Sequence, residues 1–427
     1  MTVLVFIGSL LAAMALGMPI AYALLASGVA LMWHLDLFDA QILAQNLING
    51  ADSFPLLAVP FFMLAGEIMN VGGLSRRIVD FALALVGHIK GGLGYVAILA
   101  ACLLAALSGS AVADAAALSA LLLPMMVRAG HDKSRSAGLI AASGIIGPVI
   151  PPSIGFVIFG VAGNVSISKL FLAGIVPGLL IGAALWLTWA ALVRREQIEA
   201  PPRKSLVEVM DALRAAAWAL MLPVIILVGL RFGIFTPTEA AVVAAVYALF
   251  VATVVYRELK WSQLYAIFVT AAKTSAVVMF LVAAAMVSAW LITVADLPSQ
   301  MIGLLEPLIN NPTLLLIAIM LLVIVVGTAM DMTPTILILT PVLMPVVKAA
   351  GIDPVYFGVL FIINNSIGLI TPPVGTVLNV VAGVGRMKID AVTLGVLPFM
   401  LAEFAVMFLM VLFPPLVTWP AKWLAGG

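Results

Sequence analysis

Long apolar runs separated by short polar segments occupy almost the whole of this 427-residue chain. A helix needs about 20 apolar residues to cross a bilayer, and most of the runs are close to that length. The first half contains apolar runs at 3–16, 19–34, 54–70, 93–127, 135–163 and 169–194. The second half contains apolar runs at 213–231, 236–256, 272–294, 313–347, 355–385 and 390–415. This pattern predicts an all-α polytopic membrane protein.

Two of these runs, 93–127 and 313–347, are too long for one crossing and too short for two. Each is interrupted near its middle, by Ser-Gly-Ser at 108–110 in the first and by the polar segment 327–331 in the second. We therefore expect two re-entrant hairpins, each with both helices on the same side of the membrane. Irregular backbone at a hairpin tip is tolerated at membrane depth only where it is buried or lines a cavity.

Glycine and proline positions recur at one fixed spacing. The motifs 147–152 and 368–373 both contain a glycine and a proline pair, and they lie 221 residues apart. The same offset relates Pro124 to Pro345, Gly130 to Gly351, Asp132 to Asp353, Gly174 to Gly395 and Pro177 to Pro398. The shared spacing indicates an internal duplication, with a broken helix at 135–163 and another at 355–385. Interrupted helices at corresponding positions of two halves point to a transporter's binding site.

The hairpins determine the predicted topology. Each half has five crossings, one re-entrant hairpin and one broken helix, so the second copy should be inverted relative to the first. The predicted units are a first inverted repeat at 1–195, a linker at 196–206 and a second inverted repeat at 207–427. This arrangement places sixteen Lys and Arg residues on one side and four on the other. Positive charge marks the cytoplasmic side, so we expect the linker in the cytoplasm and both termini in the periplasm.

Composition agrees with a membrane protein and excludes several classes of site. Hydrophobic residues make up 64% of the chain and charged residues 9%, whereas soluble proteins are roughly one-quarter charged. Cys102 is the single cysteine, so neither an internal disulfide nor a cysteine-based metal site can form.

Oxygen-bearing residues gather at the hairpin tips and at the helix breaks. Hydroxyl and free carbonyl oxygens suit a hard alkali cation, and a proline frees a carbonyl one turn earlier in its helix. The alternative is that these small residues only permit close helix packing; their recurrence in both halves favours ion sites. The candidate cation ligands are Ser108, Gly109, Ser110, Gly144, Gly147, Ile150, Pro151, Gly327, Thr328, Met330, Gly368 and Thr371.

Acidic and amide residues near the same tips and breaks are candidates for binding a substrate. Ionisable groups at membrane depth are costly and functional by default. For Asp114 and Asp331, which follow the tips, a structural N-cap role is the competing explanation. Glu67 and Glu403 are expected near helix ends, where their carboxylates can reach the interface. The candidate substrate contacts are Asp114, Pro152, Ser153, Asp331, Asn364, Asn365 and Pro373.

Several segments resemble one known family. The Gly and Pro-Pro breaks, Ala-Leu-Ser-Gly-Ser-Ala-Val-Ala-Asp at 106–114, Gly-Met-Pro-Ile-Ala-Tyr at 17–22 and Pro-Phe-Phe-Met-Leu-Ala-Gly-Glu-Ile-Met at 60–69 look like the large membrane subunit of tripartite ATP-independent periplasmic (TRAP) transporters. The resemblance covers essentially the whole chain. Within the family, it is closest to subunits that handle sugar acids such as diketogulonate or sialic acid.

The resemblance implies Na⁺-driven uptake of an organic anion, a sugar acid or a dicarboxylate, across a bacterial inner membrane by an elevator mechanism. It implies two partners, a small four-helix membrane subunit and a periplasmic substrate-binding protein. It also implies two Na⁺ sites. One would lie between Ser108, Ser110 and the break at 144–151, and the other between Gly327, Thr328 and the break at 365–371.

Other functions remain to be weighed. A stand-alone Na⁺/anion symporter could share this hairpin architecture and need no binding protein. An intramembrane enzyme would need an activating base for a nucleophile such as Ser108, and no histidine is expected at membrane depth. A nucleotide-driven pump would need a phosphate-binding Gly-x-x-x-x-Gly-Lys-Ser/Thr loop, which the sequence lacks.

Overall fold

The computed structural model describes residues 2–425 apart from 195, 197 and 199, and this described part contains helices and no strand. The predicted repeat boundary at 195 and the linker residue Glu199 lie outside the described residues. Before the linker the helices are α1 (Thr2–Ala15), α2 (Ile20–His34), α3 (Ala40–Ala51), η1 (Phe54–Leu57), α4 (Ala58–Val71), α5 (Leu74–Val86), α6 (Gly92–Ser108), α7 (Ala111–Arg128), α8 (Lys133–Gly144), α9 (Ile154–Gly163) and α10 (Ile167–Val193).

After the linker, the order of elements resembles the order before it. The helices are α11 (Leu206–Arg231), α12 (Pro237–Phe250), η2 (Val251–Val255), α13 (Trp261–Val294), α14 (Leu297–Ile309), α15 (Pro312–Gly327), α16 (Met332–Ala349), α17 (Pro354–Gly368), α18 (Thr376–Gly385), α19 (Ile389–Leu412) and α20 (Pro415–Ala425). Among the described residues, eight helical segments are long and apolar enough to cross a membrane.

The run at 93–127 forms a helical pair. Helix α6 ends at Ser108 and is followed by Gly109, whose φ of 62° is in the left-handed region that favours glycine. Helix α7 begins after Ser110, whose hydroxyl accepts a hydrogen bond from the Ala113 amide. In the second half, α15 ends at Gly327 and α16 begins at Met332, where the Asp331 carboxylate accepts from the Met332 amide. Both predicted interruptions are therefore turns between two helices.

Both predicted broken helices are also present as interrupted helices. Helices α8 and α9 flank an irregular segment at 145–153, and α17 and α18 flank one at 369–375. A cis peptide bond joins the proline pair in each segment, Pro151–Pro152 and Pro372–Pro373.

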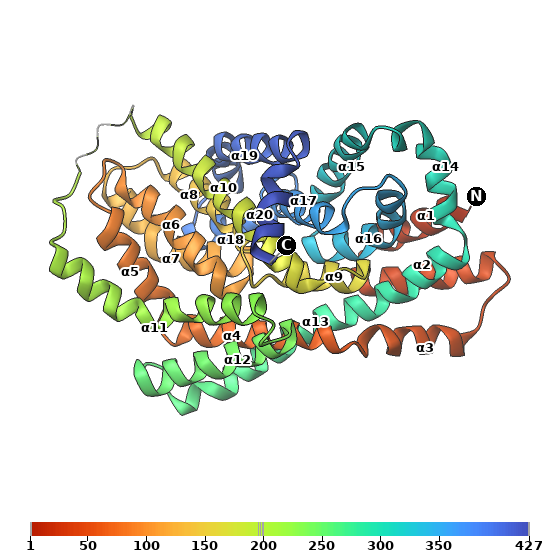
Figure 1. The fold of residues 1–427 in the computed structure, drawn as a ribbon, viewed down its shortest axis with the longest axis horizontal. Coiled ribbons are helices and arrows are strands. Elements are labelled where there is room, and N and C mark those ends of the chain that lie inside the picture. Colours follow the sequence, from red (N-terminus) through yellow and green to blue (C-terminus); the bar gives the residue numbers. More distant parts are fainter. Residues whose placement is uncertain (1, 195, 197, 199, 426–427) are drawn as a thin grey trace.

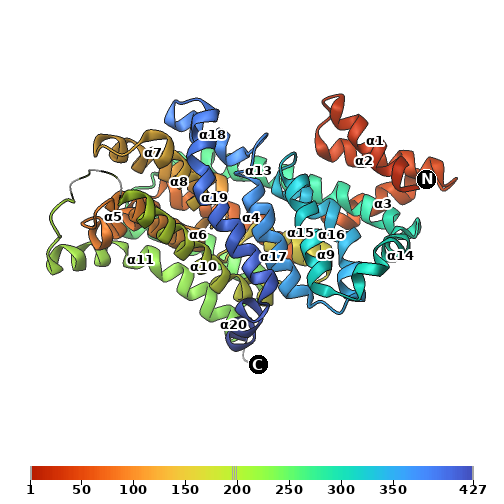
Figure 2. The same cartoon turned by 90° about the horizontal axis from the view of Figure 1, so that it is seen from above.

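The hairpins lie toward opposite ends of the long axis, with α6 and α7 near α5 and with α15 and α16 near α14 (Figure 1, Figure 2). The halves also pack against each other reciprocally. Helix α7 packs on α18 and α16 packs on α9, while α19 packs on α8 and α10 packs on α17. Each hairpin therefore contacts the helix that follows the break in the other half, α18 or α9. Each hairpin also contacts the broken helix of its own half.

Three elements differ from the sequence prediction. Helix α3 was not expected, because Gln41, Gln45, Asn46 and Asn49 interrupt its apolar pattern, yet Asp39 caps it and it packs on α13. Helix α13 begins at Trp261 rather than at 272, because its polar first turns carry little hydropathy. Helix α20 follows α19 where no separate helix was expected.

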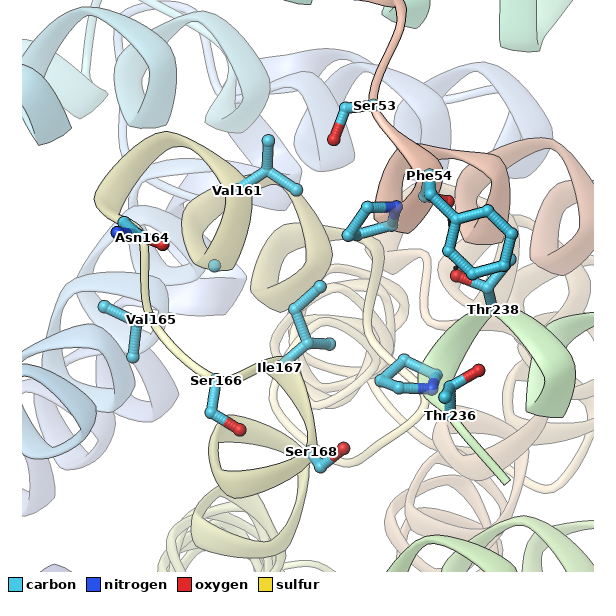
Figure 3. A pocket seen from close by; sticks show the side chains of 13 residues that line it. Ser53, Phe54, Val161, Asn164, Val165, Ser166, Ile167, Ser168, Thr236 and Thr238 are labelled. Atoms are coloured by element: carbon cyan, nitrogen blue, oxygen red, sulfur yellow. Dashed lines mark hydrogen bonds between the residues drawn. The ribbon is translucent and has the colours of Figure 1, made fainter. Parts of the chain in front are cut away.

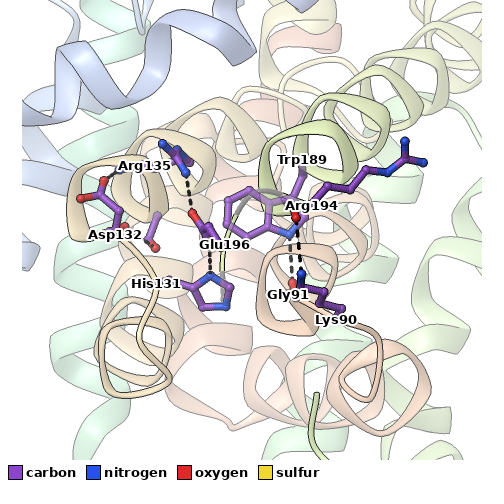
Figure 4. A network of polar contacts seen from close by, with 9 residues as sticks. Lys90, Gly91, His131, Asp132, Arg135, Trp189, Arg194 and Glu196 are labelled. Carbon is purple, nitrogen blue, oxygen red and sulfur yellow. Dashed lines mark hydrogen bonds and ion pairs between the residues drawn. The ribbon is translucent and has the colours of Figure 1, made fainter. Parts of the chain in front are cut away.

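The linker is fastened to the first half by polar contacts (Figure 4). The Glu196 carboxylate lies 3.0 Å from Nδ1 of His131 and also pairs with the Arg135 guanidinium. Lys90 donates to the Arg194 carbonyl, and the buried Trp189 indole donates to the Gly91 carbonyl at 2.9 Å. The chain leaving α10 is thus held against the α7–α8 turn before α11 begins.

Candidate functional site

The first hairpin tip is closed by a hydrogen bond between side chains. The Ser108 hydroxyl donates to Oδ1 of Asp114 at 2.6 Å, and it accepts from the Ser110 amide at 3.2 Å. Asp114 is 4% exposed. Ser110, not Asp114, caps α7, so the N-cap explanation for Asp114 is wrong. The carboxylate instead points back to the tip that precedes it.

This tip lies against the first helix break. A Cβ atom added to Gly109 would come within 3.2 Å of the Ser153 Cα, and one added to Gly147 would lie 2.7 Å from Oδ2 of Asp114. Gly144 is equally close to Ala115 on α7. The structure therefore brings the predicted residues of the first tip together with Gly144, Gly147, Pro152 and Ser153. Ile150 and Pro151 are buried within the same break.

Ser153 has a clear role inside the break. Its hydroxyl donates to the Pro148 carbonyl and accepts from the Phe156 amide, which makes Ser153 the N-cap of α9. The side chain is fully buried. Its observed contacts hold the irregular segment to the start of α9.

The second tip is more open. The Thr328 hydroxyl donates to the Val325 carbonyl of its own helix at 2.7 Å, and Asp331 is an exposed N-cap. The tip still touches the second break, since the Val374 amide donates to the Thr328 carbonyl at 3.4 Å. A Cβ atom added to Gly368 would lie 3.1 Å from the Gly327 Cα.

Other predicted residues of the second half are divided between a buried and an exposed group. Asn364 and Asn365 are buried, whereas Pro373 is exposed and Thr371 and Met330 are partly exposed. The Thr371 hydroxyl, in the irregular segment, donates to the Ile367 carbonyl near the end of α17. The predicted cation ligands Met330 and Thr371 and the predicted substrate contacts Asn364, Asn365 and Pro373 thus differ in burial, and their roles stay predictions.

Buried oxygens without a hydrogen-bond partner lie at or beside both breaks: Asp114 Oδ2, Ser143 Oγ, Asn364 Oδ1 and Asn365 Oδ1. The two amide nitrogens are committed, because Asn364 donates to the Met320 carbonyl and Asn365 donates to the Phe361 carbonyl, each at 2.7 Å. Buried polar atoms are normally satisfied. Unpartnered carboxylate, hydroxyl and amide oxygens are the ligand types that fit a hard cation such as Na⁺.

Glu403 differs from the sequence expectation. It was expected near a helix end, yet it lies within α19, is 0% exposed, and neither carboxylate oxygen has a partner. The sequence does mark this position, because Glu403 is the only acidic residue in the long apolar stretch of α19 after Asp390.

A separate pocket of about 420 Å³ lies among η1, the α9–α10 turn and the start of α12 (Figure 3). Its polar side chains are uncharged and include Ser53, Asn164, Ser166, Ser168 and Thr236. None of the sequence-predicted site residues lines it. The pocket therefore offers hydrogen-bond donors but, among its lining residues, no cationic side chain that could form an ion pair with an organic anion.

Comparison with known proteins identifies the family. The profile of the family described as "Tripartite ATP-independent periplasmic transporter, DctM component" matches residues 7–416. The chain belongs to this family. A similar TRAP protein is the "2,3-diketo-L-gulonate TRAP transporter large permease protein YiaN" of Escherichia coli (strain K12), 58% identical over 99% of this chain and 100% of that protein. The Vibrio cholerae "Sialic acid TRAP transporter large permease protein SiaM" is 42% identical over 93% of each chain.

A solved structure shares this fold at low sequence identity. The structure of the Alcanivorax borkumensis YdaH transporter matches with a TM-score of 0.66 and 18% identity, covering 90% of this chain and 91% of that one. At this identity the match concerns the fold alone. The TRAP chain is thus a multi-pass inner-membrane transporter subunit, a large permease, and not an enzyme.

Proposed function

We propose that this TRAP permease carries out Na⁺-coupled uptake of an organic anion. The observation that carries the proposal is the set of buried, unpartnered oxygens at or beside the helix breaks, which each hairpin tip contacts. In the first half, Asp114 and Ser143 would hold one ion, with carbonyls of the tip and break completing the shell. In the second half, the Asn364 and Asn365 oxygens would hold the other. The ions supply positive charge at the site, and the chain's residues position them.

The transport step would use the two halves as an elevator. Hairpins and broken helices would move as one unit, with 1–195 and 207–427 as inverted repeats on either side of the cytoplasmic linker and both termini in the periplasm. Inverted repeats supply two related states in which a midplane site faces opposite sides. The reciprocal packing of α7 on α18 and α16 on α9 supports such a unit, because it joins the two hairpins through the broken helices.

The names of similar proteins and the exposed polar tip support a proposal for the substrate class. Their names specify diketogulonate and sialic acid, both acids that carry hydroxyls. We propose a sugar acid for this chain, delivered by a periplasmic substrate-binding protein, with a small four-helix membrane subunit as permanent partner. Exposed Asp331 would accept hydrogen bonds from substrate hydroxyls.

Uptake by proteoliposomes tests this function. The permease and its small subunit are reconstituted, binding protein loaded with diketogulonate or sialic acid is added, and an inward Na⁺ gradient is applied. We expect Na⁺-dependent uptake that rises with an inside-negative potential if net positive charge enters with the substrate. Each elementary charge that crosses 100 mV is worth about 2.3 kcal/mol. Ser108→Ala should raise the Na⁺ concentration for half-maximal uptake roughly tenfold, because a charge-linked hydrogen bond at the site is lost.

A matched control removes a hydroxyl elsewhere. In Thr188→Ala the lost hydroxyl bonds only to the Ala184 carbonyl of its own helix, so Na⁺ dependence should not change. Uptake indifferent to Na⁺ would contradict the proposal. Full uptake by the permease without binding protein or small subunit would instead establish the stand-alone symporter.

A further inference from the structure

A basic cleft separates the end of α7 from the end of α18. It encloses about 350 Å³ and is lined by Ser119, Leu123, Arg128, Lys133, Val384 and Arg386, among others. Helices α7 and α18 approach each other closely at the cleft, since a Cβ atom added to Gly385 of α18 would lie 2.8 Å from a Leu123 methyl carbon. The cleft therefore lies between a helix of the first hairpin and a helix of the second half.

Three cations at this cleft have no acidic partner. Among the described residues, no carboxylate lies within 4.0 Å of the charged nitrogens of Arg128, Lys133 or Arg386. The adjacent Asp132 is occupied as the N-cap of α8, where it accepts from the Arg135 amide at 2.7 Å. All three cations are exposed and thus free to meet an anion at the cleft.

A buried hydroxyl lies deeper in the same cleft. Ser119 is 1% exposed, and its Oγ has no hydrogen-bond partner among the residues that the structure describes. It precedes Arg128 by nine residues on α7, which is about 13 Å along the helix. The cleft thus combines a cationic mouth, apolar walls and an unsatisfied hydroxyl.

The corresponding contact of the other half, between α16 and α9, shows what is special here. At the offset of 221, Ser119 corresponds to Thr340 of α16, which is also buried with an unpartnered hydroxyl and lies beside Gly163 of α9. However, the same offset relates Arg128 to Ala349 and Lys133 to Pro354, and the C-cap of α18, Arg386, is matched by the C-cap of α9, Asn164. The three cations of the α7–α18 cleft are therefore not repeated at these positions, and the one cation near the end of α16, Lys348, stands at the position of Val127.

We propose that the α7–α18 cleft is a binding site for an oxyanion, a phosphate or carboxylate group attached to an apolar chain or free in solution. Clustered cations in a pocket between transmembrane helices recognise anionic headgroups, and Arg binds oxyanions through paired donors. The proposed function places this cleft on the cytoplasmic side of the membrane. The proposal of oxyanion binding does not depend on that placement. Occupancy would brace the first hairpin against the second half.

The test measures binding by the full-length chain in neutral detergent, co-purified with its small subunit where that is present. One arm uses radiolabelled inorganic phosphate at equilibrium, and the other uses retention of phosphatidylglycerol against phosphatidylcholine in native mass spectrometry. Binding of phosphatidylglycerol alone assigns a lipid headgroup, and binding of phosphate assigns a soluble anion. Wild-type binding to neither would overturn the proposal.

The variants separate this site from general surface charge. Arg128→Gln, Lys133→Gln and Arg386→Asn should each weaken binding about fivefold; asparagine is used at 386 because φ there is 47°. Ser119→Ala should weaken binding further when it is combined with one of these three substitutions. Lys388→Gln, an exposed cation outside the cleft, and Thr340→Val, at the corresponding buried hydroxyl of α16, should leave binding unchanged. Equal losses in the Lys388 variant would show adventitious charge binding and overturn the site.

Because binding is measured without transport, its failure is distinguishable from failure of the proposed function. Na⁺-driven uptake with no oxyanion binding would reject the cleft alone. Oxyanion binding lost in the cleft variants but without Na⁺-driven uptake would support the cleft and reject the transport proposal.

Discussion

The two hairpin tips occupy corresponding positions in the chain but differ in how firmly they are held. The first is locked by the Ser108–Asp114 hydrogen bond and lies on a buried proline pair. In the second, the side chains of Thr328 and Asp331 are bonded only within the tip and its own helices, and the proline pair is exposed. Two copies of one motif have therefore diverged into a closed tip and an open tip. We propose that the first tip chiefly holds an ion while the second chiefly meets substrate.

The largest effect should come from a side chain added to the closed tip. Gly109→Ala places a Cβ atom where the backbone has φ of 62° and where Pro152 and Ser153 leave no room. The left-handed conformation alone costs roughly 1–2 kcal/mol, and displacement of the break adds to it. We expect uptake to be abolished in the proteoliposome assay.

Gly130→Ala is the matched control for that change. Gly130 has φ of 89° but nothing within 4 Å of an added Cβ atom, so it shares the backbone penalty without the clash. Uptake should persist in this variant. If Gly109→Ala transports as well as Gly130→Ala, the tight contact between tip and break has no role in transport.

An intermediate effect is expected from neutralising the two aspartates. Asp114→Asn removes the charge of a buried carboxylate with one unpartnered oxygen, so it should raise the half-maximal Na⁺ concentration about tenfold or more. Asp331→Asn changes an exposed carboxylate, so it should raise the KM for substrate severalfold and leave the Na⁺ dependence nearly unchanged. Paired Na⁺ and substrate titrations of uptake check both. The same Na⁺ shift in both variants would remove the proposed division between the tips.

Local sequence signals predicted the architecture well because glycine and proline act locally. Both hairpin turns fall within the predicted interruptions, and both breaks fall at the duplicated proline pairs. The difference between the tips was not predictable in this way. Whether Asp114 or Asp331 is buried depends on which helices pack over each tip, and that is set by contacts between distant segments. Helix α3 was missed for a related reason, since its packing on α13 compensates for its polar residues.

The smallest effect should come from the two glycines that meet where the open tip contacts its break, Gly327 of the tip and Gly368 at the end of α17. The room around these two glycines differs. A Cβ atom added to Gly368 would lie 3.1 Å from both the Cα and the carbonyl oxygen of Gly327, which are backbone atoms that cannot rotate away. One added to Gly327 would lie 3.5 Å from the Gly368 Cα, an ordinary contact. Overpacking typically costs about 1–3 kcal/mol, so Gly368→Ala should lower the thermal midpoint of the purified complex and Gly327→Ala should not. Because this tip is open, Gly368→Ala should slow uptake without abolishing it, in contrast to Gly109→Ala. Equal midpoints for the two alanine variants would mean that the second tip can retreat from its break without cost, and complete loss of uptake in Gly368→Ala would mean that the open tip is as constrained as the closed one.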